Sequence, residues 1–364
     1  MMGSSRDASG TSWQPDSTPH EGLHLMQDDW MFMAHGVLDF VYDDQGGKRG
    51  GDKSFVAGMA MLMAEHSFGD GDRLLLRGMV SPEPLMGASG YPLLFATGET
   101  ANGRDPLIDR QHPHNLVMEL SATFTHQDFY LYAGLPGEPA LGPPAYMHRL
   151  SGMDNPEAPI THHWLDSTHI TNGVVTAGEI FGDWKIEASA FNGREPNQQR
   201  YQINDPNIDS FSGRLSVNPT SNWALQASYG YLKSPEQLSP RSSQHRVTAS
   251  ASYNLPFGDN DWATTFAWGR KNDLDGFLLE SAVIVQRDDR LYLRLERADE
   301  DELDTVPATP SKASLGYVHD FPVGSYFAFG VGGTVSRYLY GGALNTAYGD
   351  NPTSGLLFLR VKLL

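Results

Sequence analysis

The links between the alternating apolar–polar runs of this chain are short and long by turns, from one end of the sequence to the other. Seven tight links follow even-numbered runs: Ser67–Asp72, His126–Asp128, Gly182–Asp183, Asn218–Asn222, Phe257–Asp261, Arg287–Arg290 and His319–Ser325. The links after odd-numbered runs are mostly longer and rich in Gly, Pro, Asp and Asn. A transmembrane β-barrel has this pattern, because turns at one membrane face are short and loops at the other are long.

The runs predict an all-β fold, a closed antiparallel transmembrane β-barrel of about 16 strands, with roughly 14 to 18 as the range of alternatives. They cover residues 30–42, 54–66, 73–81, 114–125, 129–135, 170–181, 184–192, 209–217, 223–233, 245–256, 262–270, 276–286, 291–298, 312–319, 325–337 and 355–364. Short turns are expected at the periplasmic face and long loops at the extracellular face. Residues 1–27 are expected to form a polar tail, either periplasmic or tucked into the lumen, and residues 28–364 the barrel.

Composition narrows the classes of protein further. No stretch reaches the ~18 apolar residues of a membrane-spanning helix, so a spanning chain of this kind must close its strands into a barrel. The net charge of −18 argues against a nucleic-acid partner, and the absence of Cys excludes disulfides and thiolate metal sites. Residues 1–27 lack the apolar core of an export signal, so we expect a leader to have been removed ahead of Met1.

The period of two assigns the faces of individual strands. In Val247–Leu255 the odd positions are expected to face lipid and Arg246, Thr248 and the following even positions the lumen. In Leu116–Phe124 the expected lipid face is Leu116, Met118, Leu120, Ala122 and Phe124. Aromatic residues flank the tight links, where an interfacial girdle belongs: Phe68, Phe124, Phe129, Phe181, Trp184, Trp223, Phe257, Trp262, Phe321 and Tyr326.

Charged residues fall on the predicted inner face of several strands. Residues of both signs are expected to line the pore: Arg73, Arg77, Glu119, Lys185, Glu187, Arg214, Arg246, Glu280, Arg294, Glu296, Arg360 and Lys362. Mixed charges in a barrel can set the selectivity of a water-filled channel. They can equally pair across strands and hold the wall together, and both roles are compatible.

Two oversized links, Pro82–Pro113 and Pro136–Thr168, hold most of the residues suited to chemistry. Six histidines lie within or beside them: His112, His114, His148, His162, His163 and His169. Imidazole is a common ligand of Cu and Zn, so these six are candidate metal ligands, with Asp109, Glu119 and Asp166 as their hydrogen-bond partners. The two links emerge at one membrane face and are expected to meet over or inside the lumen. The competing interpretation is that the imidazoles only hydrogen-bond loop backbones.

Methionines recur on the first two predicted strands. Met31 and Met33 share one face, and Met59, Met61 and Met63 share another. A methionine-lined patch can hold Cu(I), but methionine more often fills gaps in a core. An enzyme is not expected: Asp166, Ser167 and His169 are adjacent in sequence, yet no GxSxG motif accompanies them, and no catalytic residue is assigned.

Several stretches resemble an uncharacterised family of porin-like outer-membrane proteins of Gram-negative bacteria. They are SGTSWQPDSTP (9–19), YDDQGG (42–47), YPLLFATGET (91–100), DRQHPH (109–114), GEPALGPPAYMHR (137–149), HHWLDSTHI (162–170), AFNGREP (190–196) and SYGYLKSPE (228–236). The resemblance spans most of the chain and implies an outer-membrane location, but it carries no assigned activity or site residue.

These observations favour a porin-like channel or transporter for small solutes or ions, with a lumen narrowed by the long loops. The alternative is an outer-membrane barrel that binds Cu or Zn and takes part in metal handling. No certain cofactor is expected. The expected partners are outer-membrane lipid, small solutes or ions and, by analogy with porins, further copies of the chain in a trimer.

Overall fold

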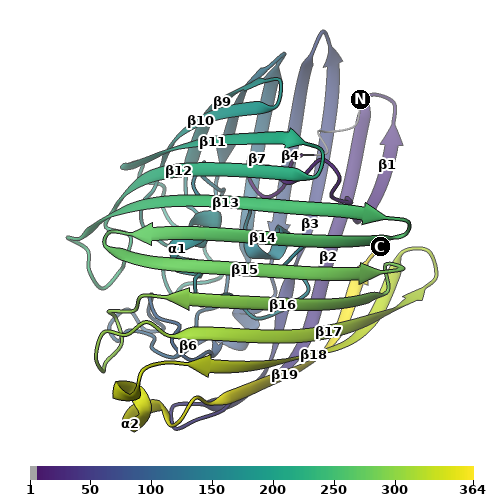
Figure 1. The fold of residues 1–364 in the computed structure, drawn as a ribbon. Coiled ribbons are helices and arrows are strands. Elements are labelled where there is room, and N and C mark those ends of the chain that lie inside the picture. Colours follow the sequence, from purple (N-terminus) through teal and green to yellow (C-terminus); the bar gives the residue numbers. More distant parts are fainter. Residues whose placement is uncertain (1–5) are drawn as a thin grey trace.

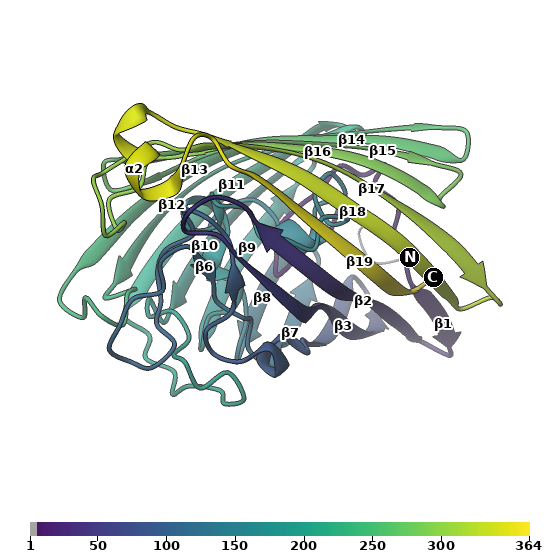
Figure 2. The same ribbon diagram turned by 90° about the horizontal axis from the view of Figure 1, so that it is seen from below.

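Sixteen antiparallel strands close into one barrel in the computed structural model, which describes residues 6–364 (Figures 1 and 2). They are β2 (Trp30–Gln45), β3 (Gly51–Gly69), β4 (Asp72–Val80), β7 (Val117–His126), β8 (Phe129–Gly134), β9 (Val174–Phe181), β10 (Trp184–Phe191), β11 (Ser210–Thr220), β12 (Trp223–Lys233), β13 (Ser243–Phe257), β14 (Asn260–Lys271), β15 (Leu274–Val285), β16 (Asp289–Ala298), β17 (Ser311–Val323), β18 (Phe327–Leu339) and β19 (Thr353–Leu363). The ring closes where β19 pairs with β2. The predicted fold class and strand number are confirmed. Within residues 6–364 no helix is long and apolar enough to cross a membrane.

The seven tight links form turns at one end of the barrel, and the long links lie at the other (Figure 1). Gly182, Gly258 and Gly324 each adopt a φ of 65° in these turns, a conformation that glycine reaches without steric cost. The last strand also ends on the short-turn side, because the Leu364 N–H donates to the Tyr326 carbonyl in the β17–β18 turn at 2.9 Å. The alternation of link lengths therefore predicted the barrel's polarity correctly.

A short strand within the predicted tail, β1 (Leu23–Gln27), joins the wall. Strand β2 pairs with β19 along residues 37–44 and with β1 along residues 30–34, so β1 continues the line of β19 at the short-turn end. The two chain segments are joined at this point by Glu21, whose carboxylate contacts Lys362 at 2.5 Å and Arg290 at 2.8 Å. The sequence did not predict β1, because an apolar–polar alternation over only five residues, flanked by Gly and Asp, is too short to be recognised within a polar tail.

The outer face of the barrel is apolar and carries the predicted aromatic girdle. All ten aromatic residues beside the tight links are exposed on this face. The prediction of a lipid-facing side chain is wrong for Met118, which is fully buried and packs inside the barrel. The cause is a bulge, since the pairing of β4 with β7 shifts between Met79 and Val80 and turns both Met118 and Glu119 inward.

Candidate functional site

The interior of the barrel is filled by three stretches of the chain: the tail (residues 6–22), the link between β4 and β7, and the link between β8 and β9. The last two contain η1 (Glu83–Met86), β5 (Tyr91–Pro92), β6 (Arg110–Gln111), η2 (Tyr146–His148), α1 (His162–Leu165) and η3 (Ser167–His169). Most residues between 136 and 173 are buried. Trp164 of α1 packs directly on the inner wall, where a Cβ added at Gly276 of β15 would lie 2.8 Å from its own Cβ.

A buried ion network ties the β8–β9 link to the wall. Arg149 contacts Glu280 of β15 at 2.8 Å and Asp166 at 2.6 Å. Arg294 of β16 binds the other oxygen of Glu280 at 3.0 Å and donates to the Glu157 carbonyl at 2.7 Å. Each of these charges is compensated by at least one partner of opposite sign, as a buried charge requires.

Other charged side chains on the inner face are also paired, either with a neighbouring strand or with the β8–β9 link. Arg360 of β19 binds Asp39 of β2 at 2.9 Å and Asp154 of the β8–β9 link at 2.7 Å. Lys312 of β17 pairs with Glu157. Glu296 of β16 accepts a hydrogen bond from the Thr161 N–H at 3.3 Å.

The tail covers another sector of the wall. Arg214 of β11 binds Glu187 of β10 at 2.9 Å and donates to the Thr11 hydroxyl at 2.9 Å. Lys185 donates to the Thr11 carbonyl, and Arg77 of β4 donates to the Gly10 carbonyl at 2.9 Å while facing Glu119.

All twelve charges predicted to line the pore face the interior. Arg73 is half-buried beside Glu65, and the other eleven are buried. Arg246 donates to the Ser167 hydroxyl of η3 at 3.0 Å, which places even this central charge against an interior segment. In this arrangement the charged side chains of the inner wall contact protein rather than a water-filled pore.

The two long links bring five of the six candidate histidines together and leave one apart. Ring centroids of His114 and His169 lie 5.0 Å apart, those of His112 and His163 5.7 Å, and those of His162 and His169 5.2 Å. The sixth, His148, belongs to η2 and borders a different cavity. Residues from both links therefore meet inside the lumen.

Two carboxylates and one backbone carbonyl orient three of these rings. Asp166 accepts from His162 Nδ1 at 2.7 Å through its side chain, and its backbone carbonyl contacts His169 Nδ1 at 2.7 Å. His114 Nδ1 faces Glu83 at 3.0 Å. Of the three predicted orienting carboxylates only Asp166 lies here: Asp109 binds Arg49 at 2.5 Å, and Glu119 faces Arg77.

Burial favours the neutral form of several rings in this cluster. Burial lowers the pKa of His112 to about 3 and the pKa values of His163 and His169 well below their usual range. Neutral imidazole is the form that ligates a metal. Three Nε2 atoms, those of His114, His163 and His169, are buried without a hydrogen-bond partner, and His112 Nε2 lies 3.3 Å from the Glu99 carboxylate.

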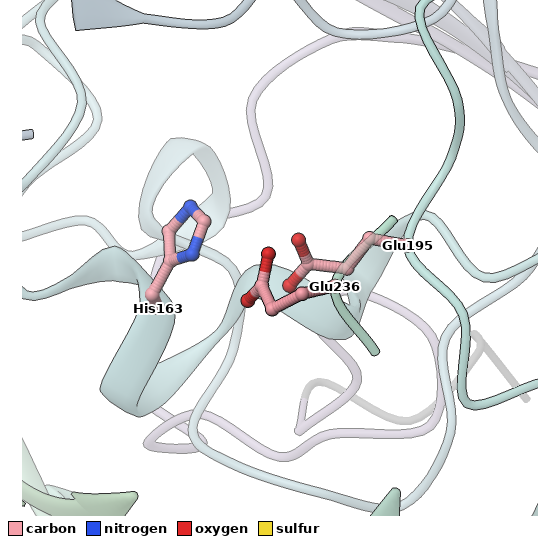
Figure 3. A group of neighbouring side chains, drawn as sticks. All are labelled: His163, Glu195 and Glu236. Atoms are coloured by element: carbon pink, nitrogen blue, oxygen red, sulfur yellow. The ribbon is translucent and has the colours of Figure 1, made fainter. Parts of the chain in front are cut away.

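One group in the described part of the chain already has metal-ligand spacing: the candidate ligand atoms of His163, Glu195 and Glu236 lie within 4.8 Å of one another (Figure 3). Burial and the neighbouring charge of Glu236 raise the pKa of Glu195 to about 8. The two carboxylates come from the links after β10 and β12, and the Glu195 N–H donates to the Pro235 carbonyl at 3.1 Å. Neither carboxylate was predicted from the sequence, where the only signal was a Glu beside a Pro in two of the stretches that carry the family resemblance.

The adjacent Asp166, Ser167 and His169 do not form a nucleophilic triad. The Ser167 hydroxyl donates to Glu195 at 3.2 Å, whereas His169 Nδ1 contacts the Asp166 carbonyl. A triad needs the nucleophile's hydroxyl on the imidazole, so this constellation does not support acyl transfer.

Comparison with known proteins places the fold among the outer-membrane porins. No family model and no curated protein matches the sequence. Among solved structures, OmpF of Salmonella typhi (in complex with daunomycin) aligns with a TM-score of 0.59 at 11% identity over 93% of this chain and 100% of its own. The anion-selective porin from Comamonas acidovorans aligns at 0.55 and 12% over 92% and 100%. The outer-membrane channel DcaP of Acinetobacter baumannii aligns at 0.51 and 10% over 93% and 98%.

At such low identities the likeness establishes the fold, a porin-like sixteen-stranded barrel. The predicted location in the outer membrane of a Gram-negative bacterium is supported by these neighbours and by the apolar, aromatic-girdled outer face.

Proposed function

We propose that this protein is a porin-like channel for small solutes or ions that is closed by its own interior segments and opens when they move. The observation that carries the proposal is the burial of eleven inward charges, each expected in a water-filled lumen, against the tail and the β8–β9 link. A barrel of sixteen strands is wide enough for solutes only when its lumen is free. Outer-membrane lipid covers the outer face in this proposal. By analogy with porins, three copies of the chain assemble into a homotrimer.

A disulfide between plug and wall tests the proposal. The chain has no Cys, so a Trp164→Cys, Gly276→Cys variant forms one defined bond. The two Cβ positions are 2.8 Å apart and must separate slightly to reach the roughly 3.8 Å of a disulfide. We expect the oxidised variant in liposomes to take up small solutes at least about tenfold more slowly than the reduced form, because α1 can no longer leave the wall.

Trp164→Cys alone is the matched control, and its uptake should not respond to the reductant. Equal uptake by the oxidised and reduced double variant, or no uptake by either, contradicts the proposal.

A second candidate function, transition-metal binding, is supported by the imidazole cluster and by His163, Glu195 and Glu236 beside it. One imidazole and two carboxylates are a ligand set that Zn(II) accepts, with room for a further neutral imidazole. The interior could then bind Zn(II) or Cu(II) either as transported cargo or as a structural ion that crosslinks the interior segments.

Calorimetric titration of the purified protein tests this second function. We expect Zn(II) to bind tighter than about 100 μM, or about −5.5 kcal/mol. A His163→Asn, Glu195→Gln variant should bind at least about tenfold more weakly. The control variant, His126→Asn with Asp72→Asn, removes an exposed imidazole–carboxylate pair and should bind as the wild type does. Binding that is absent, or equal in all three proteins, would end the metal hypothesis.

A further inference from the structure

A cavity of about 540 Å³ lies inside the barrel near its short-turn end, apart from the imidazole cluster. It is bordered by the tail, by β1–β4 and by the β8–β9 link. Its lining contains an unusually large number of methionine thioethers, those of Met26, Met31, Met33, Met61, Met63 and Met153. Imidazoles of His24, His35 and His148 share the lining.

The strand register places several of these residues directly opposite one another on the inner face. Met33 of β2 stands directly opposite Met63 of β3 and, on its other side, opposite His24 of β1. In the next row His35 stands opposite Met61. Directly opposed residues have Cβ atoms about 4.5–5.5 Å apart, so their side chains meet on the inner face.

The intervening residues confirm the orientation. Phe32 and Leu62 alternate with the methionines and are exposed on the lipid face. A purely packing role would fill the space between the methionines, as Met does in cores. Here Met33, Met61 and Met63 border a cavity on one side and pack against neighbouring methionines on the other.

Two imidazole nitrogens in the lining have no hydrogen-bond partner although they are buried, His35 Nδ1 and His148 Nε2. Buried polar atoms are normally paired, so each such atom requires an explanation. Three of the charged groups in the lining have partners of opposite sign: Arg77 faces Glu119, Glu65 faces Arg73, and Glu21 contacts Lys362.

We propose that this cavity binds a soft monovalent metal ion, Cu(I), through the thioethers of Met33, Met61 and Met63 and the imidazoles of His24 and His35. Thioether and imidazole are neutral, soft to intermediate ligands that favour Cu(I) over Mg(II), Ca(II) or Mn(II). The site lies at the periplasmic end of the lumen, is distinct from the group around His163, and does not require the barrel to conduct.

The methionine surface continues beyond the cavity. A buried cluster of Met59, Met61, Met79, Met118 and Ile170 adjoins it, and Met33, Met63 and Met147 pack against this cluster. Ile170 follows His169, a member of the imidazole cluster. Ten of the thirteen methionines thus lie in the cavity or in the cluster that leads from it toward the imidazoles. The inward turn of Met118 at the bulge in β7 adds one of them.

Anaerobic competition for Cu(I) tests the proposal. The full-length protein in detergent is titrated into the coloured Cu(I)–bicinchoninate complex under reductant, and loss of colour reports transfer. We expect about one Cu(I) per chain to transfer, and a Met33→Leu, Met63→Leu variant to bind at least about tenfold more weakly. Met and Leu have similar volumes, so the variant is expected to fold.

Met86→Leu is the matched control, because Met86 is half-buried on η1 and outside the cavity. It should bind Cu(I) as the wild type does, and so should the His163→Asn, Glu195→Gln variant. No transfer to the wild type overturns the proposal. So does equal transfer to the wild type and the cavity variant, or loss of Cu(I) binding only in the His163→Asn, Glu195→Gln variant.

Discussion

Replacing Arg149 with Met is expected to destabilise the β8–β9 link by about 3–5 kcal/mol, because it leaves two buried carboxylates without their main partner. Arg149 joins Asp166 of the link directly to Glu280 of the wall. Arg294 still compensates Glu280, so Asp166 carries most of the loss. Hydrogen exchange of residues 136–173, followed by mass spectrometry in increasing guanidinium, measures the change.

An exposed ion pair provides the control for this variant. Arg270 contacts Asp275 at 2.5 Å, but 47% of its side chain is exposed. Arg270→Met should therefore change exchange by no more than about 1 kcal/mol. If Arg149→Met left the exchange of the link within the same range, the ion network would not be what holds the link in the lumen.

Acid is expected to release the interior segments progressively as the pH falls from about 6.5 to about 3. Burial lowers the pKa of His112 and His148 to about 3 and lowers those of His162, His163 and His169. For each ring the released state binds a proton at a higher pH than the packed state does. The stabilisation is thus complete above about pH 6.5 and falls by about 1.4 kcal/mol per pH unit per ring as the pH drops toward the packed-state pKa.

Three buried carboxyls act in the opposite direction at higher pH. Burial raises the pKa values of Glu138, Glu195 and Glu300 to about 8, so their contribution is present below about pH 4.5 and is lost as the pH rises toward 8. Below pH 4.5 these groups are protonated in both states, and the imidazoles dominate. The low pKa of Asp166, which Arg149 maintains against its burial, adds to the loss in acid.

Pulsed hydrogen exchange at a series of pH values, corrected for intrinsic exchange rates, tests the acid release. A His163→Asn, His169→Asn variant should lower the pH slope by about 2.8 kcal/mol per pH unit, since two rings no longer titrate. A slope that stays the same in this variant would show that the buried imidazoles do not control the release.

The strands and turns of the barrel wall were predictable from the sequence because they depend on neighbouring residues in the chain. A period of two fixes the face of each residue, and a tight turn follows from a few residues of Gly, Asp or Asn, so β13 and the turn at Gly258 were both predicted. The error at Met118 arose because a bulge depends on the partner strand and leaves no mark on the alternation.

The interior was only partly predictable because its contacts join distant parts of the chain. Residue types and link lengths indicated that imidazoles from both long links would meet. They did not indicate that Glu195 and Glu236 would join His163, because those contacts depend on how two further links fold over the lumen. Likewise, the inward direction of Arg360 followed from alternation, whereas its partner Asp154 did not.

Single-channel conductance in planar bilayers, with and without the β8–β9 link, tests most directly whether the lumen is closed from within. The link begins and ends at adjacent points, since Gly137 and Thr171 exchange backbone hydrogen bonds of 2.9 and 2.8 Å. A short Gly–Ser connection can therefore replace the residues between them without opening the wall. We expect the deletion variant to conduct at least about tenfold more than the wild type, because its lumen is that of a less obstructed sixteen-stranded barrel. A wild-type conductance equal to that of the deletion variant would contradict a barrel closed by its own interior segments.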